Sequence, residues 1–188
     1  MLNLPNFLTF IRILTIPFFL LSLSYQRYGE ALIIFIIGGL TDFLDGLAAR
    51  LMKQQTALGA LLDPVADKLL LMTSFLVLGI NGGIPMWLVI VVISRDVLIL
   101  TGYGIIHLLV EERFKVTPST TGKISTMLQL FTLGVALAFL HNPKMLDPTL
   151  LDVLVVVTAL ATIISGFQYI YRGLVWLQDR APFMTRLG

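Results

Sequence analysis

Six long apolar runs, separated by short polar stretches, make up most of the chain. Each run is long enough to cross a bilayer as a helix, which takes ~20 predominantly apolar residues. The stretches between them carry turn-forming residues, such as Asn81-Gly82-Gly83 ahead of Pro85. The pattern predicts an all-α, polytopic membrane protein with six transmembrane helices. The predicted spans are residues 7–24, 31–51, 57–80, 85–110, 122–140 and 150–177.

Composition supports membrane spans over soluble helices. Of the 188 residues, 57% are hydrophobic and only 13% are charged, whereas soluble domains carry about 25% charged residues. Six spans leave little chain for anything else, so we expect residues 1–188 to form a single membrane domain, with the first run retained and not cleaved as a signal peptide. The absence of cysteine excludes disulfides and thiolate metal sites. A net charge of +2 is too small to indicate binding of nucleic acid.

Lysine and arginine are unevenly divided between the two predicted membrane faces. Arg27 and Lys144 lie on one face. The other face, which the positive-inside rule predicts to be cytoplasmic, would hold both termini. That face collects Arg50, Lys53, Arg113, Lys115, Lys123, Arg180 and Arg186.

Four aspartates interrupt the second and third apolar runs on the predicted cytoplasmic side: Asp42, Asp45, Asp63 and Asp67. Each carboxylate at membrane depth costs about 2.5–3.5 kcal/mol, so the group needs a counter-charge. Residues three or four apart share a helix face, and two helices joined by a short link would present both pairs to each other. Four hard oxygen donors suit Mg²⁺ or Mn²⁺. Two adjacent metals could grip a phosphoanhydride and stabilise displacement at phosphorus.

The residues around the aspartates point to a ligand but leave alternatives open. Gly46 and Gly59 would allow close approach of a ligand or a second helix, and Arg50 could bind a phosphate or balance the aspartates. Structural ion pairs of the aspartates with Arg50, Lys68 or Arg95 are one alternative. A cation transporter that uses intramembrane carboxylates is another, although it gives no role to the two glycines and Arg50.

The segment 42–67 matches D-x2-D-G-x2-A-R-x8-G-x3-D-x3-D without a mismatch. This motif resembles the signature of the CDP-alcohol phosphatidyltransferases, membrane enzymes of phospholipid synthesis. The resemblance extends over most of the chain. In detail, the chain is similar to bacterial phosphatidylglycerophosphate synthases. The further matching positions are Leu4-Pro5-Asn6, Thr9, Arg12, Asp63-Pro64, Ala66-Asp67-Lys68, Arg95-Asp96, Gly122-Lys123, Thr126 and Gln129.

The resemblance implies a six-helix homodimer in the bacterial inner membrane, with a site open to the cytoplasmic leaflet. It implies that the four aspartates hold two divalent cations, Mg²⁺ or Mn²⁺, and that Asp67 doubles as general base. The base would activate an alcohol that attacks the phosphorus bearing diacylglycerol, and CMP would leave. The residues implied to contact the donor, CDP-diacylglycerol, are Asn6, Asp42, Asp45, Gly46, Arg50, Thr56 and Gly59.

The alcohol acceptor is the part on which family members differ. Arg95 and Lys123 are the candidate acceptor-binding residues, although Arg95 could instead form a structural pair with Asp96. The glycerophosphate enzymes typically carry further cations at the positions of Tyr103 and Ser125, and typically read Arg-Glu at the position of Arg95-Asp96. Fewer cations suit a singly charged acceptor, so the sequence favours phosphatidylglycerol, as in cardiolipin synthases. Glycerol 3-phosphate is the alternative, followed by inositol-type acceptors.

Overall fold

The structure is a computed structural model that describes residues 4–52, 57–109 and 119–184, with side chains described for 14–41, 68–102, 104, 119–175 and 178. The described backbone is all-helical, as predicted, and contains six helices. They are α1 (Leu4–Ser24), α2 (Tyr28–Met52), α3 (Ala57–Ile80), α4 (Met86–Leu109), α5 (Thr120–His141) and α6 (Pro148–Met184).

Each predicted span is found as one helix, with ends that differ by a few residues. The turn between α3 and α4 includes Gly82, whose φ of 74° suits a glycine. The largest differences are in α6, which begins at Pro148 and continues to Met184. Within the described residues, the two helices long and apolar enough to cross a membrane are Thr120–His141 and Pro148–Val175. The six-span membrane topology therefore stays a prediction.

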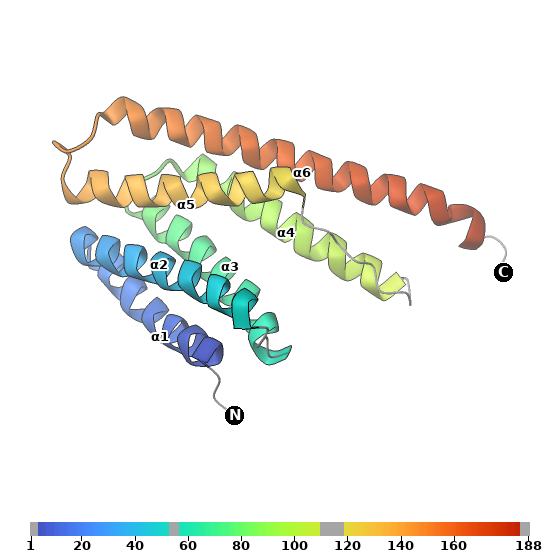
Figure 1. The fold of residues 1–188 in the computed structure, drawn as a ribbon. Coiled ribbons are helices and arrows are strands. Elements are labelled where there is room, and N and C mark those ends of the chain that lie inside the picture. The colour runs from blue at the N-terminus through green and yellow to red at the C-terminus, as the bar shows by residue number, and fades with distance from the viewer. Residues whose placement is uncertain (1–3, 53–56, 110–118, 185–188) are drawn as a thin grey trace.

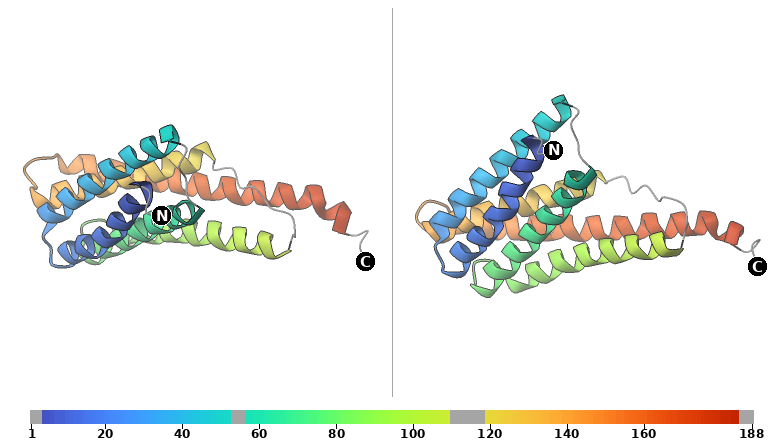
Figure 2. Two further views of the ribbon diagram at one scale, coloured as in Figure 1. Left: turned by 60° about the horizontal axis from the view of Figure 1, so that its bottom comes forward. Right: turned by 90° about the horizontal axis from the view of Figure 1, so that it is seen from below.

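The helices run alternately up and down in one elongated bundle. The turns α1–α2, α3–α4 and α5–α6 lie at one end of it, whereas the first residues of α1 and α3 and the last residues of α2 lie at the other (Figures 1 and 2). Helix α1 packs on α2 and α3, α4 packs on α3 and α6, and α5 packs on α6 and α2. The bundle thus gathers the two halves of the aspartate motif at the same end.

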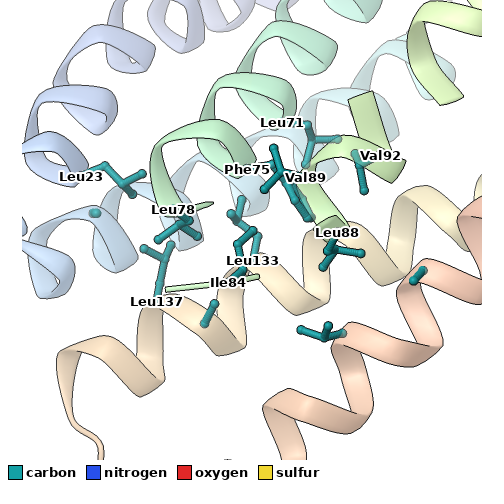
Figure 3. Close-up of a cluster of buried hydrophobic side chains, with 14 of the residues drawn as sticks. Leu23, Leu71, Phe75, Leu78, Ile84, Leu88, Val89, Val92, Leu133 and Leu137 are labelled. Atoms are coloured by element: carbon teal, nitrogen blue, oxygen red, sulfur yellow. The ribbon is translucent and has the colours of Figure 1, made fainter. Parts of the chain in front are cut away.

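The apolar core lies toward the end with the turns. Phe75 and Leu78 of α3 meet Leu88 of α4 and Leu133 and Leu137 of α5, all with fully buried side chains (Figure 3). Close approach of α3 to α4 depends on Gly79, where a Cβ would lie 2.6 Å from Val89 Cγ2. The halves of α2 and α3 that carry the aspartates extend away from this packed end.

A polar strip runs along the contact between α5 and α6. Ser125, Gln129 and Thr132 of α5 and Thr158 and Thr162 of α6 are all buried. The hydroxyls of Ser125 and Thr162 lie 3.0 Å apart, those of Thr132 and Thr158 lie 2.7 Å apart, and Gln129 Nε2 donates to Thr162 Oγ1 at 3.1 Å. Such bonds are worth about 0.6 kcal/mol each on average in membrane proteins. We refer to these five residues as the α5–α6 polar strip.

Candidate active site

The four aspartates lie on helical backbone, as their spacing predicts. Asp42 and Asp45 fall in the second half of α2, and Asp63 and Asp67 fall in the first half of α3. These two helix segments lie at the same end of the bundle (Figure 1). The four side chains are outside those that the structure describes, so their convergence on metal stays a prediction.

Most of the predicted donor-binding residues are likewise described by their backbone alone. Asn6 lies on α1, Gly46 and Arg50 on α2, and Gly59 on α3, and each contributes helical backbone at the aspartate end. Thr56 lies outside the described residues. Their contacts with the donor remain predictions.

A charged cluster joins α3 to α4 directly after the motif. Asp96 accepts a hydrogen bond from Arg95, with 2.6 Å between Oδ1 and Nη1, and the same oxygen lies 3.7 Å from Lys68 Nζ. The Asp96 side chain is 5% exposed, that of Arg95 11% and that of Lys68 35%. The structural pair of Arg95 with Asp96, left open by the sequence, is therefore present. Lys68 also pairs with Asp96, a partner that the sequence did not indicate. We refer to these three residues as the Arg95–Asp96–Lys68 cluster.

Arg95 lies in a slot formed by α5 and α6. Its Nη2 donates to Ser165 Oγ at 2.9 Å. A Cβ on Gly122 would lie 3.2 Å from Nη2, and one on Gly166 would lie 3.6 Å from Arg95 Cγ. The buried Nε has no hydrogen-bond partner among the described residues. Arg95 is thus held firmly, but one of its donors is unused.

The second predicted acceptor-binding residue, Lys123, is not part of this cluster. It follows Gly122 in the chain, but its side chain is exposed, and no ion pair of Lys123 is found among the described residues. Ser165 was missed by the sequence analysis. Its only signal was a hydroxyl within the last apolar run, at a distance of 70 residues from Arg95.

Ser125, one of the two positions where the glycerophosphate enzymes typically carry a cation, is fully buried in the α5–α6 polar strip. The side chain of Tyr103, the other position, is outside the described ones. In this chain, position 125 therefore contributes to the contact between two helices.

An apolar cavity of about 200 Å³ opens between α1, α2, α3 and α5. Gly38 and Gly39 line it one helical turn before Asp42, and Leu70 and Leu71 line it one turn after Asp67. Apart from the adjacent residues and the helix's own backbone, no heavy atom of the described residues lies within 4 Å of the position that a Cβ would take on either glycine. The other lining residues are Thr15, Ile16, Phe19, Ile34, Phe35, Thr126 and Leu130.

The chain matches a family model and several named proteins. A family model for CDP-alcohol phosphatidyltransferase matches residues 2–167. The chain is 36% identical to the CDP-diacylglycerol–glycerol-3-phosphate 3-phosphatidyltransferase of Haemophilus influenzae, over 89% of this chain and 91% of that protein. It is 32% identical to the Bacillus subtilis protein of the same name, over 90% and 94%.

A third relative has a different name. The chain is 38% identical to a Mycobacterium tuberculosis protein provisionally named a cardiolipin synthase, over 66% of this chain and 59% of that protein. The two long apolar helices and a family of membrane lipid synthesis together indicate a membrane protein. The family match covers the aspartate motif, the cavity and the Arg95–Asp96–Lys68 cluster alike, and the chain belongs to the CDP-alcohol phosphatidyltransferase family.

Proposed function

We propose that the protein transfers a phosphatidyl group from CDP-diacylglycerol to glycerol 3-phosphate and releases CMP. Two relatives that carry this acceptor in their names align over about nine tenths of both chains. This proposal reverses the preference for phosphatidylglycerol that the missing cations at Tyr103 and Ser125 indicated. Membership of an enzyme family also removes the reason to favour a cation transporter.

The choice of acceptor is carried by these two relatives, and the structure supports an anionic acceptor through the convergence of two cations. The sequence indicated Arg95 as an acceptor-binding residue but not Lys68, which shares Asp96 with it. Two cations and one carboxylate leave the cluster with one net positive charge. A phosphate monoester binds favourably to cationic donors because hydrogen bonds to charged groups are about twice as strong as neutral ones.

The donor set of the aspartate motif fits two divalent cations. Positions 42 and 45, and positions 63 and 67, are helical pairs on segments at one end of the bundle, and four carboxylates are the hard ligands that Mg²⁺ and Mn²⁺ prefer. When bound, the two cations would neutralise the phosphoanhydride and stabilise the leaving CMP.

In the proposed reaction, Asp67 accepts the proton of the acceptor hydroxyl. The freed oxygen attacks the phosphorus that bears diacylglycerol, and the bond from that phosphorus to CMP breaks. Arg95 and Lys68 hold the acceptor phosphate, with Lys123 as a further candidate. Gly46 and Gly59 leave room for the CDP moiety, which Arg50, Asn6 and Thr56 would contact.

The apolar cavity is a candidate site for one acyl chain of the donor. Its walls are mainly apolar, and it begins one turn from the positions of Asp42 and Asp67. An acyl chain in this cavity would leave the diphosphate near the aspartates. The open space at Gly38 and Gly39 would then serve the lipid and not helix packing.

The membrane arrangement and the assembly belong to this proposal as well. We take residues 1–188 as one domain in the bacterial inner membrane, with the site facing the cytoplasm because lysine and arginine gather on that side. A homodimer is expected from the family resemblance.

Phosphatidylglycerol is the second candidate acceptor, which would make the protein a cardiolipin synthase. The relative provisionally given that name is 38% identical over 127 residues. A cluster with one net positive charge also suits a phosphodiester with one negative charge. The two candidates differ in acceptor and share the donor, the metals and the base.

The test is CMP release by purified protein given CDP-diacylglycerol and Mg²⁺ or Mn²⁺, with glycerol 3-phosphate and phosphatidylglycerol offered separately. Release with glycerol 3-phosphate alone supports the proposal, and release with phosphatidylglycerol alone replaces it with the second candidate. Excess EDTA should stop turnover in both cases, and undiminished turnover would remove the two-metal site.

A further inference from the structure

Asp96 is a buried carboxylate. One of its oxygens, Oδ1, contacts two cations on different helices, Arg95 on α4 and Lys68 on α3. We propose that Asp96 is a positioning residue of the transfer reaction, which holds Arg95 and Lys68 together as the binding site for the anionic acceptor. This inference rests on the proposed function, in which these two cations bind the acceptor.

The electrostatics explain why a carboxylate is needed there. Lys68 and Arg95 both lie within 4 Å of one oxygen atom, so without Asp96 they would repel each other at short range. A buried carboxylate with a 5% exposed side chain is itself costly unless it is paired. Asp96 therefore stabilises a pair of cations that would otherwise separate, and it leaves one net positive charge for the acceptor.

Arg95 and Lys68 are held in place, but the described residues do not use all of their N–H donors. A guanidinium has five N–H donors, of which Nη1 donates to Asp96 and Nη2 to Ser165, while Nε has no partner among the described residues. A lysine ammonium has three donors, and Lys68 keeps a 35% exposed side chain. Lys68 is therefore open to an additional anion, whereas Arg95, with an 11% exposed side chain and a buried Nε, offers an anion less surface.

The position of Lys68 links the cluster to the proposed chemistry. Lys68 directly follows Asp67 on α3, and Asp96 follows Arg95 on α4. Through Asp96, the acceptor-binding arginine is therefore fixed relative to the helical turn that carries the proposed base. A displacement of about 1 Å between reacting groups can cost 100-fold in rate, so this link matters for turnover.

The first test compares Asp96→Asn with wild type in the CMP-release assay, with the concentrations of donor and acceptor varied separately. We expect kcat/KM for the acceptor to fall about 10- to 100-fold, by analogy with the loss of a partner that orients a metal ligand, while KM for CDP-diacylglycerol changes less than about twofold. Asp96→Glu keeps the charge and should recover most of the acceptor kcat/KM. Asp152→Asn, the same change on the exposed side of α6, is the matched control.

A purely structural role for Asp96 gives a different result. It predicts that Asp96→Asn lowers the unfolding temperature while kcat/KM for the acceptor in the folded fraction stays within about twofold of wild type. That result would overturn the proposal. An equal rise in KM for donor and acceptor would overturn it as well.

If Asp96→Asn does not fold, two milder variants decide the question. Ser165→Ala removes the second anchor of the Arg95 guanidinium, and Lys68→Gln removes the other cation on Asp96. We expect each to raise KM for the acceptor about 3- to 10-fold with an unchanged KM for the donor. Wild-type acceptor kinetics in both variants would refute the inference.

The alcohol that the wild-type protein uses distinguishes a failure of this inference from a failure of the proposed function. If wild type uses an alcohol other than glycerol 3-phosphate, the proposed function is wrong, and the same ratios measured with that alcohol still test Asp96. If no alcohol supports CMP release, both are overturned.

Discussion

The sharpest test of the Arg95 slot is a single methyl group added at Gly122. In Gly122→Ala, the new Cβ would lie 3.2 Å from Arg95 Nη2 and 3.1 Å from Ser119 Oγ. Both separations are tighter than ordinary carbon contacts of about 3.5–4.0 Å. Ser119 caps α5 by accepting from the Gly122 N–H at 3.0 Å. The methyl group must therefore displace the guanidinium, the cap or both.

The size of the effect follows from these contacts. Overpacking costs about 1–3 kcal/mol, and replacement of a helical glycine by alanine returns about 1 kcal/mol. Loss of the Arg95–Ser165 bond, a hydrogen bond to a charged group, would cost about 1.5–3 kcal/mol more. If that bond is lost, Gly122→Ala should therefore destabilise by about 1.5–5 kcal/mol, or roughly 3–20 °C in unfolding temperature at the 2–4 °C per kcal/mol of a chain this size.

Gly166→Ala is the matched comparison. Its Cβ would lie 3.6 Å from Arg95 Cγ, which is an ordinary contact, so it should keep the gain of about 1 kcal/mol in helix propensity. Thermal unfolding in detergent and KM for the acceptor are measured for both variants. We expect Gly122→Ala to raise KM for the acceptor several-fold, and Gly166→Ala to change it far less. Equal stabilities and equal acceptor KM values would refute the slot as the determinant of Arg95's position.

Three further changes test other parts of the site and fold. Asp67→Asn should abolish CMP release while the unfolding temperature is kept, and full activity would remove the proposed base. Gly38→Leu should fill the apolar cavity and raise KM for CDP-diacylglycerol, whereas Gly173→Leu, which also has open space at its Cβ, should not; equal donor KM values would argue against a lipid in the cavity. The backbone N–H of Thr149 donates to Asp147 at 2.9 Å and holds the pKa of that carboxyl below its ordinary value. The ionised form therefore stabilises the start of α6 above about pH 4, and this contribution is lost as pH falls through the lowered pKa. Asp147→Ala should lower the unfolding temperature at neutral pH, with a difference from wild type that shrinks in acid; a difference independent of pH would contradict the capping role.

The helices could be predicted because apolar runs of this length have few alternatives. Their ends were less certain because they depend on local bonds. The sequence placed the start of the last helix at residue 150, whereas α6 begins at Pro148. Proline suits the first helical position, where its missing N–H is not needed, and the Asp147 carboxylate accepts from the N–H of Thr149.

The charged cluster could be predicted only in part. The sequence named Arg95 and Asp96 as a possible pair because they are neighbours, and that pair is confirmed. Lys68 reaches Asp96 from α3, and Ser165 reaches Arg95 from α6. Their participation depends on how three helices are rotated about their axes, and apolar periodicity does not determine rotation when most faces of a helix are apolar.

The α5–α6 polar strip bears on the proposed acceptor site, although its own residues are not proposed to contact the acceptor. Its members on α6, Thr158 and Thr162, are followed on the same helix face by Ser165, which holds Arg95. A slip of α6 by one turn would break every bond in the strip at once and would carry Ser165 about 5.4 Å from the guanidinium. The strip thus sets the position of α6 along α5, and with it the position of Ser165, the partner of Arg95. If Arg95 binds the acceptor as proposed, changes in the strip should alter KM for the acceptor without touching the acceptor site.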